Sequence, residues 1–163
     1  MEYQLPKGGI KLNKVVKKPR IELLAPAGSL EKLKTAIRFG ADAVYLGGNK
    51  LNLRAFADNF SDEELIEAVA FAHSRNCKVY VTVNVFPHND DLMGLEEYLL
   101  RLYELKVDAI IASDPGVIMT ATQVTPKLEI HLSTQANNVN FKSMLFWYKQ
   151  GIKRIVIARE LSL

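Results

Sequence analysis

The sequence predicts an α/β protein in which parallel strands alternate with helices, and three observations carry this prediction. Six short apolar runs recur along the chain, and most are nearly continuous rather than alternating, as strands covered on both faces require. Stretches with the apolar spacing of amphipathic helices separate these runs. Similar junctions close several of the helices, with Gly or Asn followed by an apolar residue, a charged residue and a strand.

The apolar runs are rich in Val, Ile, Leu and Tyr, which favour strands. They cover residues 21–25, 43–46, 78–83, 109–112, 128–132 and 154–158. The run at 21–25 leads through a Pro/Gly turn to Ser29, which is well placed to cap a helix that ends at Gly40. Together with the next run, this segment forms one βαβ unit, and the rest of the chain repeats its pattern.

Each predicted helix carries a start signal or a clear apolar stripe. Ser61 and Glu64 form the sequence pattern of a capping box, and Pro115 stands in the first turn of a later helix. The helices are expected at about residues 29–39, from residue 61 onward, and at about 91–105, 115–123 and 141–149. The order is therefore βα repeated five times, followed by a sixth strand.

The junctions after the helices predict left-handed backbone. Gly40, Asn76 and Gly151 stand where such a cap is needed, and Lys106 occupies the equivalent place, where a left-handed backbone should cost about 1 kcal/mol. Cys77 falls in the apolar position of the junction, so we expect a buried structural thiol. Because it is the only cysteine, the chain alone forms no disulfide and no cysteine-ligated metal cluster.

Length and charge indicate one domain with a basic lead-in. The chain has 163 residues and a net charge of +3. The first 20 residues contain six Lys or Arg and one Glu, a net charge of +5, so the other residues sum to −2. We expect residues 1–20 to be a flexible segment, or alternatively an arm that contacts RNA phosphates, and 21–163 to be the folded domain. No apolar run approaches the length of a membrane span, and no secretory signal is present, so we expect a cytoplasmic protein.

Two architectures fit this order of elements. One is an open, doubly wound parallel sheet, and the other is a (β/α)8 barrel that is cut off after its sixth strand. A complete barrel needs about 200 residues or more, and 143 of the 163 residues follow the basic segment. The residues alone therefore slightly favour the open sheet.

In either architecture, ligands bind beyond the carboxyl ends of the strands. Amides, hydroxyls and two arginines gather there, and few of these groups suit acid–base chemistry at neutral pH, so a polar or planar ligand is expected and no catalytic or metal-binding residue is identified. The candidate binding residues are Ala27, Gly28, Gly47, Gly48, Arg54, Asn84, Ser113, Asp114, His131, Ser133, Gln135, Asn137, Arg159 and Glu160.

Several of these candidates have a purely structural alternative. Gly47 and Gly48 suit a tight turn and lack the dinucleotide-binding fingerprint. Asp114, before a proline, is typical of a helix N-cap. His131 lies inside a strand, where a hydrogen-bonded core histidine is the simpler interpretation. Arg54 could bind a ligand or form a surface ion pair.

Five collinear motifs resemble the N-terminal half of the U-32 peptidase family, the collagenase-like proteins. They lie at residues 22–29, 40–48, 113–116, 131–137 and 158–163. The resemblance implies a TIM-like barrel, which overrides the preference for an open sheet. It also implies that this chain is the N-terminal part of a longer protein, truncated after strand six, and that the cysteines holding the family's iron–sulfur cluster lie outside it.

The resemblance implies two different activities. Some family members are described as peptidases, whereas others hydroxylate a nucleobase of tRNA or ribosomal RNA. A peptidase needs an activated nucleophile or a metal-bound water, and the residues offer neither. We therefore expect the whole protein to be an iron–sulfur-dependent RNA hydroxylation enzyme acting on tRNA, with a collagenase-like peptidase as the alternative.

The chain by itself has two further expected properties. It could act as a non-catalytic binding module, since it carries no cofactor ligands of its own. Strands one and six would be unpaired edges of an unclosed barrel, and exposed edges invite pairing, so self-association is expected.

Overall fold

The computed structural model of the chain describes residues 21–51 and 59–161. The basic segment 1–20 and the candidate residue Arg54 lie outside the described residues. The described part contains one sheet of six strands. Four of them agree with the predicted runs to within one residue at each end, whereas β1 begins three residues later than predicted and β6 ends three residues earlier. The strands are β1 (Leu24–Pro26), β2 (Ala43–Gly47), β3 (Lys78–Val83), β4 (Ala109–Ala112), β5 (Glu129–Leu132) and β6 (Arg154–Ile155).

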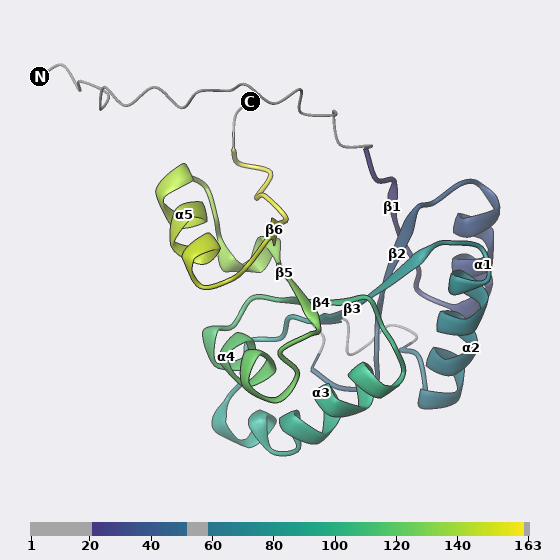
Figure 1. Cartoon of the computed structure of the whole chain (residues 1–163), viewed down its shortest axis with the longest axis horizontal. Coiled ribbons are helices and arrows are strands. Elements are labelled where there is room, and N and C mark those ends of the chain that lie inside the picture. Colours follow the sequence, from purple (N-terminus) through teal and green to yellow (C-terminus); the bar gives the residue numbers. More distant parts are fainter. Residues whose placement is uncertain (1–20, 52–58, 162–163) are drawn as a thin grey trace, which may run out of the picture.

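The strands follow one another in the sheet in sequence order, from β1 to β6, and every neighbouring pair is parallel. The sheet curls into half a barrel (Figure 1). A doubly wound sheet would reverse its strand order at a switch point, so the open-sheet alternative is wrong. Because every right-handed crossover steps in the same direction, all the helices are placed on one side of the sheet.

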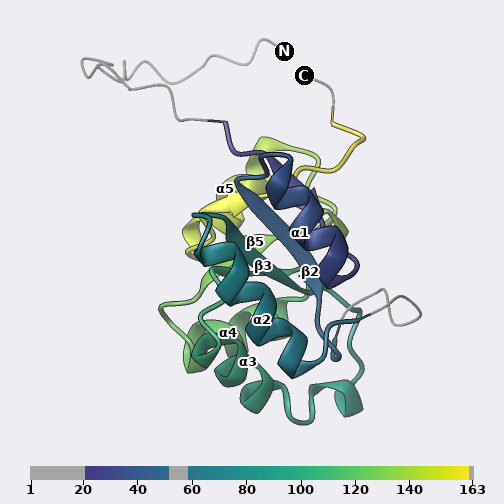
Figure 2. The ribbon, with the colours of Figure 1, turned by 90° about the vertical axis from the view of Figure 1, so that its right-hand side faces the viewer.

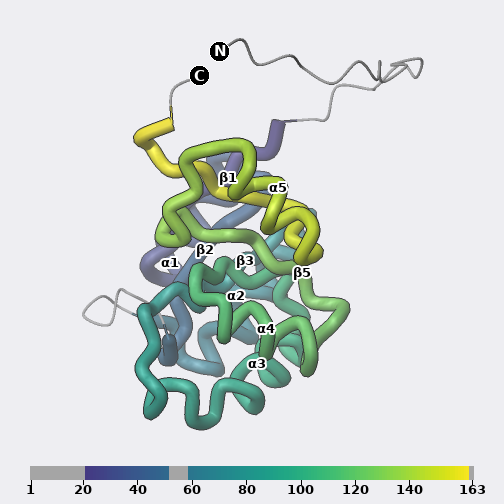
Figure 3. The backbone as a smooth tube through the Cα atoms, turned by 90° about the vertical axis from the view of Figure 1, so that its left-hand side faces the viewer, coloured from purple at the N-terminus to yellow at the C-terminus, as the bar shows by residue number. Residues whose placement is uncertain are grey.

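The helices lie along the outer side of the curled sheet (Figure 1). Figure 2 shows α1 and α2 side by side over β2 and β3, and Figure 3 shows α3 and α4 beside each other, with α5 near β5. No helix of the described residues is long and apolar enough to cross a membrane. The helices are α1 (Leu30–Arg38), α2 (Asp62–His73), α3 (Leu95–Glu104), α4 (Pro115–Val124) and α5 (Phe141–Lys149).

The predicted capping interactions are present, and one predicted helix is divided in two. The Ser61 side chain accepts from the Glu64 amide at 3.2 Å, and the Glu64 carboxylate accepts from the Ser61 amide at 2.9 Å. The helix expected over 91–105 is instead a short 3-10 turn, η1 (Asn89–Leu92), followed by α3. Gly94 separates them with a left-handed φ of +75°, a conformation that interrupts a helix and is easiest for glycine.

The left-handed junctions predicted after the helices are confirmed. The backbone φ angles of Gly40, Asn76, Lys106 and Gly151 are +93°, +55°, +61° and +92°. Lys106 therefore carries the expected strain of about 1 kcal/mol relative to glycine. Cys77 is buried as predicted, and burial raises the pKa of its thiol to about 11, so it stays protonated at neutral pH.

Residues of each strand alternate between two environments. The outward side chains, such as Val44, Val81 and Ile110, pack with the helices in the main core. The inward side chains form a second, smaller cluster in which Tyr80, Ala109 and Ile111 are central. The curl of the sheet therefore gives its concave face a separate interior.

A polar cluster lies in this interior and joins the two edges of the sheet. Arg154 of β6 forms an ion pair with Glu22, which precedes β1, and the Tyr80 hydroxyl donates to both Glu22 carboxylate oxygens at 3.0 Å. Burial alone would raise the pKa of Glu22, but hydrogen bonds from Arg154 and Tyr80 lower it below its ordinary value. The cluster connects strands that are not neighbours in the sheet.

Strands β1 and β6 are the edges of the described sheet. Each pairs on one side only, and they contain three and two residues. Short edges of this kind are still templates for another strand. Self-association through them stays a prediction.

The Glu22 cluster predicts a specific dependence of stability on pH. Because the folded pKa of Glu22 lies below its unfolded value of about 4.5, its contribution is present above pH 4.5 and is lost as the pH falls through the folded pKa. We expect Glu22→Gln to lower the free energy of unfolding by about 1–2 kcal/mol at pH 7, and to reduce the loss of stability between pH 5 and pH 3.

Urea unfolding at several pH values measures this difference. Glu67→Gln is the matched control, because it breaks the exposed ion pair with Lys34 and should cost less than about 1 kcal/mol. Equal pH profiles for the Glu22→Gln variant and the unaltered chain would contradict the assignment.

Candidate functional site

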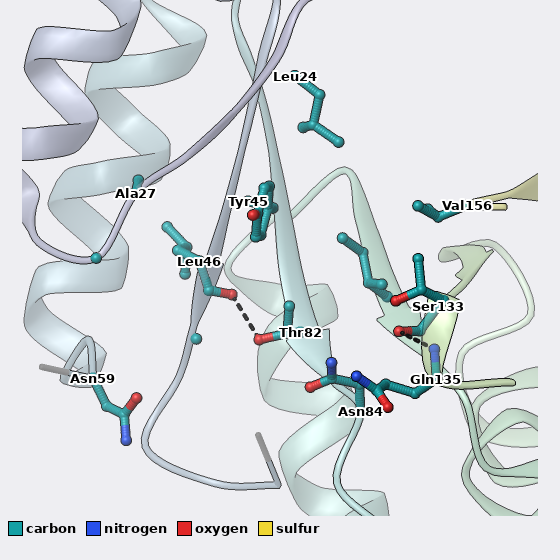
Figure 4. Close-up of a pocket in the computed structure, with 14 residues that line it drawn as sticks. Leu24, Ala27, Tyr45, Leu46, Asn59, Thr82, Asn84, Ser133, Gln135 and Val156 are labelled. Atoms are coloured by element: carbon teal, nitrogen blue, oxygen red, sulfur yellow. Dashed lines mark hydrogen bonds between the residues drawn. The ribbon is translucent and has the colours of Figure 1, made fainter. Parts of the chain in front are cut away.

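A pocket of about 330 Å³ opens at the carboxyl ends of the strands, on the concave face of the sheet (Figure 4). All six strands, or the turns that directly follow them, contribute to it. The described residues that line it are Leu24, Ala27, Gly28, Tyr45, Leu46, Gly47, Asn59, Thr82, Asn84, Ile111, Ser133, Thr134, Gln135 and Val156.

One part of the pocket is apolar and aromatic. Leu24, Tyr45 and Ile111 belong to the inward-facing cluster of the strands, and Val156 follows β6. Figure 4 shows the ring of Tyr45 and the side chain of Leu24 above the polar end of the pocket. A flat apolar surface beside an aromatic ring suits a planar ring of a ligand.

The other part consists of hydroxyls and amides held by local hydrogen bonds. The Thr82 hydroxyl donates to the Leu46 carbonyl at 3.1 Å, and the Ser133 hydroxyl accepts from the Gln135 amide at 3.3 Å. In Figure 4 the side-chain amides of Asn84 and Gln135 lie at this same end. Backbone contacts fix the positions from which these side chains reach the pocket.

The described lining residues include no Asp, Glu, Lys, Arg or His. A pocket of hydroxyls and amides satisfies a neutral polar ligand, whereas a charged ligand would lose its hydration without gaining a counter-ion. The volume is at the small end of ligand pockets, which favours one small ring system over an extended chain. The geometry therefore favours a neutral, planar, hydrogen-bonding ligand.

The structure brings six of the predicted binding residues together in this pocket. They are Ala27, Gly28, Gly47, Asn84, Ser133 and Gln135. Ser113 lies just outside and supports the site, because its buried hydroxyl donates to the Asn84 carbonyl at 3.4 Å. Asp114 takes its alternative role, capping α4 by accepting from the Val117 amide at 3.0 Å. Asn137, Arg159 and Glu160 are exposed and do not line the pocket.

His131 lies deeper in the interior than the pocket. Its ring packs edge-on against Tyr80 with the centroids 4.5 Å apart, and its Nε2 lies 3.0 Å from the Glu129 carboxylate. Burial lowers the pKa of His131, although the Glu129 hydrogen bond opposes this shift. This environment matches the alternative of a hydrogen-bonded core histidine.

Gly48 is buried and does not line the pocket. A Cβ at this position would lie 2.2 Å from the Tyr98 hydroxyl, so only glycine fits against that ring. The Tyr98 hydroxyl is itself buried without a hydrogen-bond partner among the described residues. Close packing therefore explains this glycine.

Sequence reasoning missed the apolar half of the pocket. Leu24, Tyr45, Ile111 and Val156 look like ordinary strand residues in the sequence and not like part of a binding surface. The alternation of side chains along a strand could have identified one of them, because residues two positions apart face the same side. Tyr45 lies two residues before Gly47, so it belongs to the same face of the strand as a predicted binding residue.

The described residues contain no arrangement of a nucleophile with its base. His131 contacts Glu129 and Tyr80, whereas the Ser133 hydroxyl is engaged by the Gln135 amide. Nor does any group of three His, Cys, Asp or Glu side chains in residues 21–51 and 59–161 suit a metal ion.

Comparison with known proteins identifies a matching protein family. The sequence pattern of peptidase family U32 matches residues 28–163. The chain is 51% identical over 148 residues to tRNA hydroxylation protein P1 of Bacillus subtilis, an alignment that covers 91% of this chain and 35% of that protein. The chain therefore spans about a third of the length of this relative.

Other relatives carry different names. The chain is 45% identical over 143 residues to an uncharacterized protease of Methanocaldococcus jannaschii, covering 88% of this chain and 34% of that protein. It is 38% identical over 144 residues to a 23S rRNA 5-hydroxycytidine synthase of Escherichia coli, covering 88% of this chain and 21% of that protein.

Solved structures agree on the fold. The U32 peptidase Mk0906 matches with a TM-score of 0.68 at 17% identity, over 96% of this chain and 62% of that one. The putative copper homeostasis protein CutC of Streptococcus agalactiae matches with a TM-score of 0.67 at 21% identity, over 84% of this chain and 72% of that one. At these identities the likeness concerns the fold alone.

The contact between Gly48 and Tyr98 predicts a non-additive pair of substitutions. Gly48→Ala should lower the free energy of unfolding by about 2 kcal/mol or more, because its Cβ would overlap the Tyr98 hydroxyl. Tyr98→Phe should be neutral or stabilising by about 1 kcal/mol, since the hydroxyl it removes is buried without a partner. With the hydroxyl gone, the nearest ring atom is 3.4 Å from the new Cβ, an ordinary contact.

Chemical unfolding of the two single variants and the double variant measures this coupling. We expect Gly48→Ala to cost less than about 1 kcal/mol in the Tyr98→Phe background. Additive effects of the two substitutions would contradict this packing.

Proposed function

The chain belongs to peptidase family U32, and from this membership and the pocket we propose that the whole protein hydroxylates a nucleobase in RNA, with tRNA as the substrate. The observation that carries the proposal is a pocket of about 330 Å³ whose described lining residues are uncharged, with amides and hydroxyls beside an aromatic ring. A nucleobase is neutral, planar and rich in hydrogen-bonding groups. The relatives named for tRNA hydroxylation and for 5-hydroxycytidine synthesis support the same reading.

Binding in this pocket requires the base to leave its stack. Enzymes that act on a nucleobase take the target out of the helix or loop and hold it between aromatic and apolar side chains. Tyr45, with Leu24 and Ile111 nearby, offers such a surface, and Asn84 and Gln135 offer hydrogen bonds to the edge of the base. The chain thereby binds and orients the base and shields it from water.

Replacing a C–H bond by C–OH is a two-electron oxidation, which needs an oxygen source and an electron acceptor. The described lining residues bind and orient, and none of them suits this redox role. We therefore assign the oxidation to parts of the whole protein, or to co-substrates, beyond the residues described. The chain's share of the activity is recognition.

An iron–sulfur cluster belongs to the proposal for the whole protein, but the residues of this chain do not fit one. Such clusters are held by several cysteine thiolates. The single cysteine, Cys77, is buried, and burial raises the pKa of its thiol to about 11. The cluster would take its cysteine ligands from outside these 163 residues.

Peptide hydrolysis is the alternative that the family's name suggests. It would need an activated nucleophile in the pocket, and the lining residues described above include a Ser and two Thr but no His, Lys or carboxylate to activate them.

RNA as the partner is also favoured by the charge of residues 1–20, since six Lys or Arg attract phosphates independently of sequence.

Tyr45 provides the test of the pocket. We expect Tyr45→Leu in the whole protein to reduce hydroxylation of RNA by about fivefold to a hundredfold, because stacking of a base on an aromatic ring contributes about 1–3 kcal/mol. Mass spectrometry of nucleosides from tRNA, in cells whose own copy of the gene is deleted and replaced, measures the product.

Tyr103→Leu is the matched control, because Tyr103 is exposed on α3 outside the pocket. It should leave hydroxylation unchanged. The proposal would be wrong if deletion of the gene left hydroxylated uridines in tRNA intact, or if the whole protein cleaved peptides in a manner that required Tyr45.

A further inference from the structure

Gln135 differs from the other amides of the pocket. It lies in the 3-10 turn η2 (Thr134–Ala136), directly after β5, where its backbone amide donates to the Ser133 hydroxyl at 3.3 Å. Within the part of the chain that the structure describes, no hydrogen bond engages its side-chain carboxamide. Asn59 and Asn84 each take part in a further interaction of the molecule. The backbone of Gln135 is therefore held in place, while its terminal carboxamide can still rotate so that its NH2 group and its carbonyl exchange places.

A carboxamide that turns over presents either of two faces to a ligand. With its NH2 group forward it donates two hydrogens, and with its carbonyl forward it accepts. Uridine carries an accepting carbonyl at position 4, whereas cytidine carries a donating amino group at the same position. The two pyrimidines are alike in size and shape, and N3 beside position 4 reverses with it, donating in uridine and accepting in cytidine. One pocket can therefore hold both if a carboxamide that faces this edge can turn over, because its donor and acceptor then exchange places.

From this geometry we infer that Gln135 contacts the exocyclic group at position 4 of the bound pyrimidine and, by turning over its carboxamide, lets one pocket accept both uridine and cytidine. This inference rests on the proposed function, since it names the substrate class of the same pocket. Gln135 is then the residue that determines which pyrimidines the pocket accepts.

The surroundings of Gln135 support this role. The described lining residues bring no charge that would fix the direction of a dipole, so neither orientation of the carboxamide is strongly favoured in advance. Gln135 is exposed at the polar end of the pocket, on the side where a base that stacks on Tyr45 would present an edge (Figure 4). A rotation of the terminal amide needs no movement of the backbone.

Two substitutions at Gln135 should shift specificity in opposite directions. The carboxylate of Gln135→Glu only accepts, so it should favour cytidine, whose amino group donates. The ammonium of Gln135→Lys only donates, so it should favour uridine, whose carbonyl accepts. We expect each variant to change the ratio of uridine to cytidine hydroxylation by about tenfold, in opposite senses.

The experiment uses the whole protein and two RNA stem-loops that differ only by uridine or cytidine at the modified position. Initial rates of hydroxylation are measured for both RNAs by mass spectrometry. The unaltered protein should hydroxylate both within about tenfold of each other. Gln135→Met, which keeps the length but removes the hydrogen bonds, should slow both RNAs and leave their ratio unchanged. Thermal unfolding of each variant checks that it folds.

Each outcome decides between the claims. Opposite shifts of the ratio for the Glu and Lys variants support the inference. Equal losses for both RNAs in every variant, or a discrimination of more than a hundredfold by the unaltered protein, would overturn the inference and leave the proposed function standing. If the unaltered protein hydroxylates neither RNA while its deletion removes no modification from tRNA, the proposed function fails and the inference fails with it.

Discussion

The curl of the parallel sheet is the constraint on which the rest of the structure depends. Because the six strands follow in sequence order, every crossover helix lies on the outer side, and the concave side is left to the inward-facing residues. The ion pair between Glu22 and Arg154, with Tyr80, connects the two edges across that interior. Without the curl, the pocket residues of β1, β3 and β5 would not face one another.

The same curl separates stability from recognition along each strand. On β2, Val44 packs in the main core with the helices, whereas Tyr45 faces the pocket. Lower in the interior, His131 packs edge-on against Tyr80, and each forms a hydrogen bond with a glutamate. Amides and hydroxyls line the pocket at the carboxyl ends of the strands. The described lining residues of this site are polar or apolar and uncharged, which suits recognition of a base more than cleavage of a peptide bond.

The periodicity of the sequence predicted the six strands and five α-helices of the described residues, because continuous apolar runs and capping residues act locally, but it missed the two 3-10 turns. It predicted left-handed backbone at Lys106 for the same reason. The choice between an open sheet and a barrel was wrong on the residues alone, since strand order depends on the direction of each crossover, which local patterns do not encode. Similarly, Tyr45 and Ile111 look like ordinary strand residues, and the packing of Gly48 on Tyr98 joins segments 50 residues apart in the sequence.

The central claim is that the pocket at the carboxyl ends of β1 to β6 holds a nucleobase. A crystal structure of the whole protein bound to an RNA stem-loop that it modifies tests this claim most directly. The account predicts one unstacked base inside the pocket, with the Tyr45 ring against its face and the Asn84 and Gln135 amides at its edge. A complex in which the target base lies elsewhere and the pocket faces no part of the RNA would contradict it.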